Sequence, residues 1–165
     1  MIIKKNTEML LFRFNNYKSN NFIAEHNSVL EREGFVWMLK IGKRSSIEKL
    51  DIIIEQGGWL ILRSPKADGS KSFLAHFSEY AENEPKEKCF PLYYREILNS
   101  ISDEDTLYSS EPSYQWFKLD YLTPLDKHSA AEIVVSKSEK KVDSVVNTTR
   151  TAVMFVKNAV PIEVK

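Results

Sequence analysis

The spacing of apolar residues along the chain predicts a mixture of helices and strands. Apolar positions recur at helical spacing from Phe22 to Leu30, and Gly34 stands where a glycine commonly ends a helix. A second helix is expected to begin after Ser45 or Ser46, because serine is a favoured N-cap residue, and to end before residue 57. Short segments with the composition of strands separate and follow these two helices.

Strands are predicted where runs of β-branched and aromatic residues lie between turn signals. The run over residues 35–41 is apolar almost throughout, which is typical of a central strand buried on both faces. The turn at Ala67–Ser70, in which Gly69 is free to take a positive φ, favours an antiparallel pair on either side of it. Further helical turns are expected within residues 90–101 and 141–147, the latter capped near Ser138. The predicted strands cover residues 9–14, 35–41, 59–64, 72–77, 114–122, 132–136 and 151–156.

This order of elements is neither a regular strand–helix alternation nor a series of hairpins. It favours an α+β fold in which a twisted, partly closed mixed β-barrel carries helices at its openings. A chain of 165 residues fits one domain, expected over residues 9–157, with residues 1–8 and 158–165 as flexible termini. The polar, acidic stretch at residues 102–112 is expected to be an exposed excursion.

Composition narrows the class of protein. Apolar residues make up 42% and charged residues 28%, which is an ordinary globular balance. No apolar run approaches the roughly 20 residues that span a bilayer, so no membrane partner is expected. Cys89 is the only cysteine, which excludes an internal disulfide and a thiolate zinc cluster. A cytoplasmic location is the simplest expectation.

The net charge of the chain is zero, but the charges are unevenly distributed. Residues 9–76 contain ten Lys and Arg against seven Asp and Glu, and residues 127–165 contain seven against four. The segment between them, residues 77–126, contains four against eleven. If the two basic segments meet in space they form a basic face, which is compatible with a polyanionic partner.

No catalytic signature is recognisable in the sequence. The glycine pattern of a phosphate loop, a dinucleotide fingerprint, a nucleophile elbow and a zinc-protease motif are all missing. His26 is expected at the surface or at the edge of the core, His128 in solvent, and His76 in a strand where it is a candidate to line a pocket. We therefore predict no catalytic residue, no metal ligand and no cofactor, and a non-enzymatic role is favoured.

Aromatic residues beside cations are the most suggestive feature. Trp59 and Arg63 share one face of a predicted strand, and Trp116 and Lys118 share a face of another. An aromatic ring can stack on a base while a neighbouring cation offsets the charge of a phosphate. The alternative is that the tryptophans form the core and the cations cover its rim with their aliphatic stems.

Several phrases resemble the PUA-like superfamily, particularly its EVE and ASCH branches. They are Gly34–Lys40, Gly57–Arg63, Ser72–Phe77 and Thr149–Val156. The resemblance implies a small curled barrel with helices at its openings, in a superfamily whose members bind RNA or hold a flipped modified base in an aromatic pocket. The pocket positions it implies are Trp37, Lys40, Trp59, Arg63, Ser64, His76 and Trp116.

The favoured hypothesis is therefore a module that binds a nucleotide or a modified base in nucleic acid by aromatic stacking. A second hypothesis is a protein-interaction or regulatory protein, such as an inhibitor or a component of a defence or toxin system, with a protein partner and no affinity for nucleic acid. A third is a hydrolase or nuclease that uses His76 and acidic residues.

Overall fold

The computed structural model describes residues 1–100 and 114–165, so the excursion expected over residues 102–112 lies outside the described part. Contacts between residues divide the chain into two compact units. The first comprises Met1–Asn15, Ile47–His76 and Leu122–Lys165, and the second comprises Asn16–Ser46 and Phe77–Tyr121. Compact units of this kind occur within domains as well as between them, so the single domain over residues 9–157 stays a prediction.

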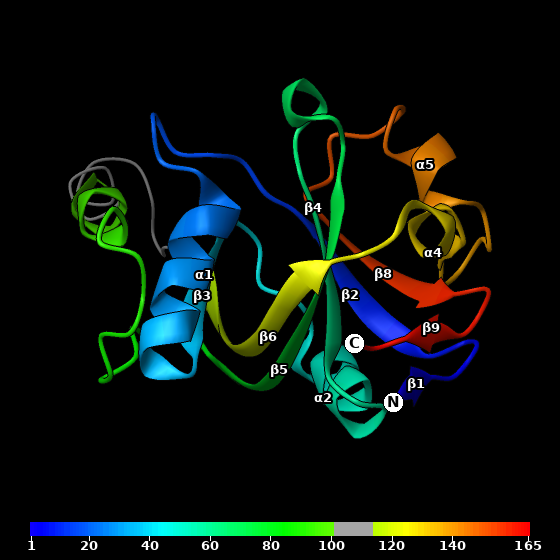
Figure 1. The fold of residues 1–165 in the computed structure, drawn as a ribbon, viewed down its shortest axis with the longest axis horizontal. Coiled ribbons are helices and arrows are strands. Elements are labelled where there is room, and N and C mark those ends of the chain that lie inside the picture. The colour runs from blue at the N-terminus through cyan, green and yellow to red at the C-terminus, as the bar shows by residue number, and fades with distance from the viewer. Residues whose placement is uncertain (101–113) are drawn as a thin grey trace. The chain divides into compact units, whose positions relative to one another are not determined.

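The first unit is built on a mixed sheet (Figure 1). Its strands are β2 (Glu8–Arg13), β4 (Trp59–Arg63), the beginning of β5 (Ser72–Ala81), β7 (Ile133–Val135) and β8 (Val153–Asn158). They lie in the order β5-β4-β2-β8-β7. β2 and β4 run parallel, whereas the β4–β5, β2–β8 and β7–β8 pairs are antiparallel. β2 and β4 are almost wholly buried, as expected for apolar strands with a neighbour on each side.

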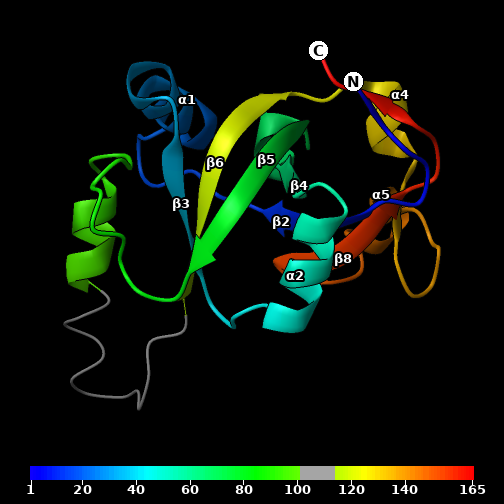
Figure 2. The same cartoon turned by 90° about the horizontal axis from the view of Figure 1, so that it is seen from below.

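Short helices and a small second sheet complete the first unit. Helix α2 packs on β2 and buries Leu50 and Ile53 against the sheet (Figure 2). At the chain termini two short strands pair antiparallel, and they bury Ile3 and Ile162. The elements are α2 (Ile47–Glu55), the 3-10 helix η1 (Lys66–Asp68), α4 (Lys127–Ala131), α5 (Val142–Val145), β1 (Ile2–Ile3) and β9 (Ile162–Glu163).

The second unit packs helices against a smaller sheet. It contains α1 (Phe22–Glu33), β3 (Val36–Ile41), most of β6 (Tyr114–Pro124) and the end of β5, in the strand order β3-β6-β5. Residues 94–100 are helical. Gly34 ends α1 with a φ of 85°, and its N–H donates to the carbonyl of Leu30. β3 is buried from Val36 to Lys40, as the apolar run predicts.

The α+β class expected from the sequence is confirmed, and each predicted strand corresponds to an observed one. Three short elements were not expected: β1, β9 and α4. Helix α5 was expected to be capped near Ser138, but its N-cap is Lys141, which makes no side-chain capping hydrogen bond. β1 and β9 pair with each other from segments far apart in the sequence, so local periodicity carries little signal for them.

Within the described ranges, 1–100 and 114–165, no helix combines the length and the apolar character needed to cross a membrane.

Candidate anion-binding site

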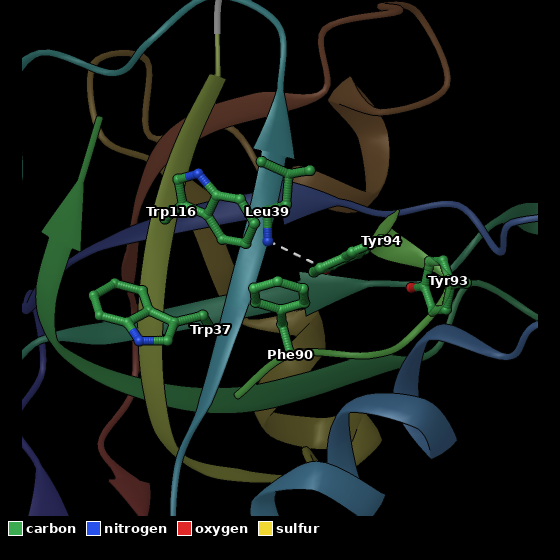
Figure 3. Close-up of a cluster of buried hydrophobic side chains, with 6 residues drawn as sticks. All are labelled: Trp37, Leu39, Phe90, Tyr93, Tyr94 and Trp116. Carbon is green, nitrogen blue, oxygen red and sulfur yellow. Dashed lines mark hydrogen bonds between the residues drawn. The ribbon is translucent and has the colours of Figure 1, made fainter. Parts of the chain in front are cut away.

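Two of the tryptophans expected in a pocket belong to the core of the second unit (Figure 3). Trp37 is 6% exposed and Trp116 is fully buried. They belong to one cluster with four other buried side chains, and neither indole N–H has a hydrogen-bond partner among the described residues. A base would reach either ring only after this cluster opened. The other members are Leu39, Phe90, Tyr93 and Tyr94.

Trp59 and His76 are brought together in the first unit. They lie opposite each other on β4 and β5, and their rings meet edge to face with centroids 5.0 Å apart. Trp59 is buried, while His76 is half-buried. The imidazole thus covers part of the indole, which is a packing contact between neighbouring strands.

Lys40 is a buried cation in the second unit. It is 1% exposed, and its Nζ donates to the carbonyl of Lys43 at 2.8 Å and to Oγ of Ser45 at 2.9 Å. Both acceptors are uncharged, so they offset only part of the cost of removing an ammonium group from water. Burial accordingly lowers the pKa of Lys40 from 10.5 to about 8.

This pKa predicts a rise in stability at alkaline pH. Between pH 8 and 10.5 the unfolded chain keeps the Lys40 proton and the folded chain loses it, so the free energy of unfolding increases with pH. Relative to Lys40→Met, the wild-type protein should gain about 2 kcal/mol between about pH 8 and 9.5, measured by urea unfolding. The exposed neighbour Lys43→Met serves as control and should follow the wild-type profile. Parallel profiles for Lys40→Met and wild type would contradict the assignment.

His26 lies in the core rather than at the surface or at the edge of the core. It is fully buried in α1, with Nδ1 2.7 Å from the carbonyl of Phe22 and Nε2 2.5 Å from the hydroxyl of Tyr94. A carbonyl only accepts, so Nδ1 carries the proton and Nε2 accepts from Tyr94. Tyr94 in turn accepts from the backbone N–H of Leu39. Burial lowers the pKa of His26 from 6.5 to about 4.

Arg63 and Ser64 lie at the edge of the first unit's sheet where β2 and β4 end. The two strands are parallel and in register, so Arg13 at the end of β2 lies beside Arg63 at the end of β4. Arg13 also pairs through its N–H with the carbonyl of Ala152, just before β8. The carboxyl ends of parallel strands are a common place for ligands, because the connecting loops diverge there.

A cavity of about 370 Å³ opens at this edge. Four of its lining residues are cations, and they come from both basic segments of the sequence. None of the described residues that line it is an Asp or a Glu. The cationic members are Arg13, Arg63, Lys66 and Arg150, and the polar members are Asn15, Ser64, Ser70, Asn147 and Thr149.

The two arginines at the strand ends are held in different ways. Nη1 of Arg13 donates to the carbonyls of Thr149 at 2.9 Å and Thr151 at 3.3 Å, so the guanidinium is oriented without being neutralised. Nη1 of Arg63 donates to Oδ1 of Asp143 at 2.7 Å, and the Arg63 side chain is 12% exposed. In the described part of the chain, Arg13, Lys66 and Arg150 pair with no carboxylate.

Ser64 is fixed by the turn that connects β4 to β5. Its N–H donates to the carbonyl of Lys71, and its Oγ accepts from the N–H of Lys71, both at 2.8 Å. The turn is closed by Gly69 and Ser70, which have φ values of 87° and 49°. Since Oγ already accepts a hydrogen bond, the hydroxyl proton of Ser64 remains to be donated to a ligand.

Of the seven residues expected to bind a ligand, Arg63 and Ser64 line this cavity. Trp59 and His76 contact each other, and Trp37, Lys40 and Trp116 belong to the second unit. Arg13, Lys66 and Arg150 also line the cavity, and they were not among the residues expected to bind a ligand. The available signal was that Arg13 and Arg63 each end an apolar strand, but their proximity depends on a parallel pairing that no local pattern reveals.

The described residues offer a site for an anion but no site for a metal ion. Among them, no three His, Cys, Asp or Glu side chains come together in a group that could hold a metal ion. The basic cavity is suited to an oxyanion, since guanidinium groups match the geometry of phosphate and carboxylate oxygens.

Comparison of the chain with protein-family models, with curated proteins and with solved structures found no match.

Proposed function

We propose that the protein binds the phosphate of a nucleotide, either free or within a nucleic-acid strand, in the cavity where β2 and β4 end. The observation that carries this proposal is the lining of that cavity, which contains four cations and no carboxylate among the described residues. A volume of about 370 Å³ accommodates a phosphate together with part of its sugar.

The arrangement of donors supports an anion rather than a neutral ligand. Arg13 is held in place by backbone carbonyls, so little conformational entropy would be lost when its remaining N–H groups bind an oxyanion. Ser64 offers a hydroxyl proton in the same cavity, and Lys66 and Arg150 add positive charges at exposed positions. Together these groups make the charge-assisted hydrogen bonds that phosphate favours.

The whole chain has no net charge, so the attraction is local. A ligand held through one or two phosphates should show a modest salt dependence, with a slope of log affinity against log salt of magnitude about 1 to 2. A protein that follows a duplex over many phosphates would show a steeper one. This distinguishes a nucleotide-sized site from a broad nucleic-acid surface.

The proposed PUA-like relationship points in the same direction, since members of that superfamily bind RNA or modified bases. We extend the proposal to a partly closed barrel of this type, with the phosphate of the bound nucleotide at the arginine cavity. Stacking on Trp37 or Trp116 is not part of this proposal, because both rings are covered by the core of the second unit.

The test is a charge reversal at the two exposed cations, Lys66→Glu with Arg150→Glu. Binding of fluorescent single-stranded DNA and RNA dodecamers would be measured by anisotropy at about 50 and 200 mM salt. The double variant should lose about tenfold to 100-fold in affinity at the lower salt, because two favourable contacts become repulsive.

The control is Lys5→Glu with Lys137→Glu, which makes the same change in net charge at exposed lysines outside the cavity. It should lose less than about threefold, because neither lysine lines the cavity and salt weakens the interaction between exposed charges that are not in contact. Equal losses in both double variants would reject the cavity as the binding site. A wild-type protein that binds neither these oligonucleotides nor free nucleoside monophosphates at low salt would reject the proposal in favour of a protein partner.

A further inference from the structure

A second cavity adjoins the arginine cavity in the first unit. Its volume is about 770 Å³, and Arg63 and Ser70 line both cavities. The two cavities are therefore neighbours, and a ligand that reaches past Arg63 would contact both. The apolar members of the second lining are Phe73, Pro124, Leu125, Ala130 and Ala131.

The charges of the two cavities differ in a way that separates the parts of such a ligand. The arginine cavity has cations alone among its described charged residues, whereas the second also contains the carboxylates of Asp126 and Asp143. Because Lys71 and Lys127 also line the second cavity, its charges nearly balance, and a phosphate is favoured more strongly in the first cavity, which has no carboxylate to offset its cations. An apolar ring bearing N–H donors is favoured in the second, where carboxylates and serine hydroxyls can accept its hydrogen bonds.

Arg63 is the residue on which the two cavities meet. Its Nη1 is paired with Asp143 at 2.7 Å, so its plane is fixed while its remaining N–H groups stay available. A fixed guanidinium can bind a phosphate oxygen at its edge and pack against an aromatic ring with its face. Both modes require that the side chain be ordered, and its low exposure is consistent with that.

We infer that the second cavity receives the base of the nucleotide whose phosphate occupies the arginine cavity. The ligand class is then a nucleoside monophosphate, or one nucleotide unit of a strand, held at both ends. This inference rests on the proposed function, and it adds that affinity depends on the base and not only on the phosphate.

The experiment compares nucleoside monophosphates with ribose 5-phosphate, which carries the same phosphate and sugar without a base. Calorimetric titration of the wild-type protein with AMP, GMP, CMP and UMP should show at least one that binds about tenfold or more tighter than ribose 5-phosphate. Ala130→Phe, which places a ring in the second cavity, should reduce that ratio to about one.

Two further variants control for misfolding of Ala130→Phe and for a general effect of an added ring. Ala130→Leu fills less of the cavity and should give an intermediate ratio, so the inference does not depend on the folding of one variant. Ala24→Phe adds the same ring at an exposed position of α1 that lines neither cavity, and it should leave the ratio as in the wild type.

The outcomes separate the two proposals. If the wild-type protein binds all four nucleotides and ribose 5-phosphate equally, the base does not occupy the second cavity, and the phosphate site stands. If the ratio is high but unchanged in both Ala130 variants, the base lies elsewhere and the inference is overturned. If neither the monophosphates nor the oligonucleotides bind, the proposed function fails and the inference fails with it.

Discussion

Gly57→Ala should destabilise the protein by about 4 kcal/mol, the largest effect that we expect from a single methyl group. Gly57 has a φ of 129°, a conformation that side-chain-bearing residues rarely adopt. A Cβ at this position would lie 2.7 Å from Nε1 and 2.9 Å from Cδ1 of Trp59. The Trp59 ring is buried and packs against His76, so it cannot swing away without disturbing β4 and β5.

Gly42 provides the matched control for this substitution. Its φ is 114°, similar to that of Gly57, but a Cβ there would meet no atom of the described residues within 4 Å. Gly42→Ala should therefore cost only the backbone strain, about 1 to 2 kcal/mol. Both values come from urea unfolding monitored by circular dichroism. Equal losses of stability in the two variants would show that the indole of Trp59 can move aside without cost, and would contradict tight packing at the start of β4.

The second large effect is an acid destabilisation that depends on His26. Below pH 6.5 the unfolded chain takes up a proton on this residue, whereas the folded chain does not until about pH 4. The unfolded state thus binds more protons in this window, and the free energy of unfolding falls as the pH falls. We expect a loss of about 3 kcal/mol between pH 6.5 and 4 from this residue.

The measurement is the free energy of unfolding as a function of pH for wild type, His26→Gln and His128→Gln. His26→Gln should be less stable at neutral pH, because it loses the imidazole's hydrogen bonds to the Phe22 carbonyl and the Tyr94 hydroxyl. Its free energy of unfolding should nevertheless decline less steeply in acid. His128→Gln alters an exposed histidine and should retain the steep decline. The same slope in all three proteins would rule out His26 as the group responsible.

Local signals predicted much of the fold. The periodicity from Phe22 to Leu30 and the glycine at position 34 located α1 at both ends, because a helix and its caps are determined by adjacent residues. Alternation along the strands showed which side chains share a face. It did not show whether that face meets the core or a cavity, which is why Trp37 and Trp116 were expected in a pocket and are found in a packed cluster.

Local sequence patterns could not predict which cations form the candidate site. Arg13 and Arg63 are neighbours only because β2 and β4 pair in parallel across the chain that contains α1, β3 and α2. Arg150 joins them only because β8 adds to the other edge of β2. Each of these pairings is decided by the packing of whole strands, so the sequence alone suggested a basic face without its members.

The long separation between the walls of the arginine cavity has a consequence for biosynthesis. Arg13 and Thr149, which are joined by a hydrogen bond, lie 136 positions apart. While the ribosome is still making the middle of the chain, β2 has no β8 to cover one of its edges, and that strand carries the apolar run Met9–Phe12. An uncovered apolar edge pairs readily with other chains. The nascent protein therefore passes through an interval in which aggregation or chaperone binding competes with completion of its sheet, and slow translation of the last segment should prolong that interval.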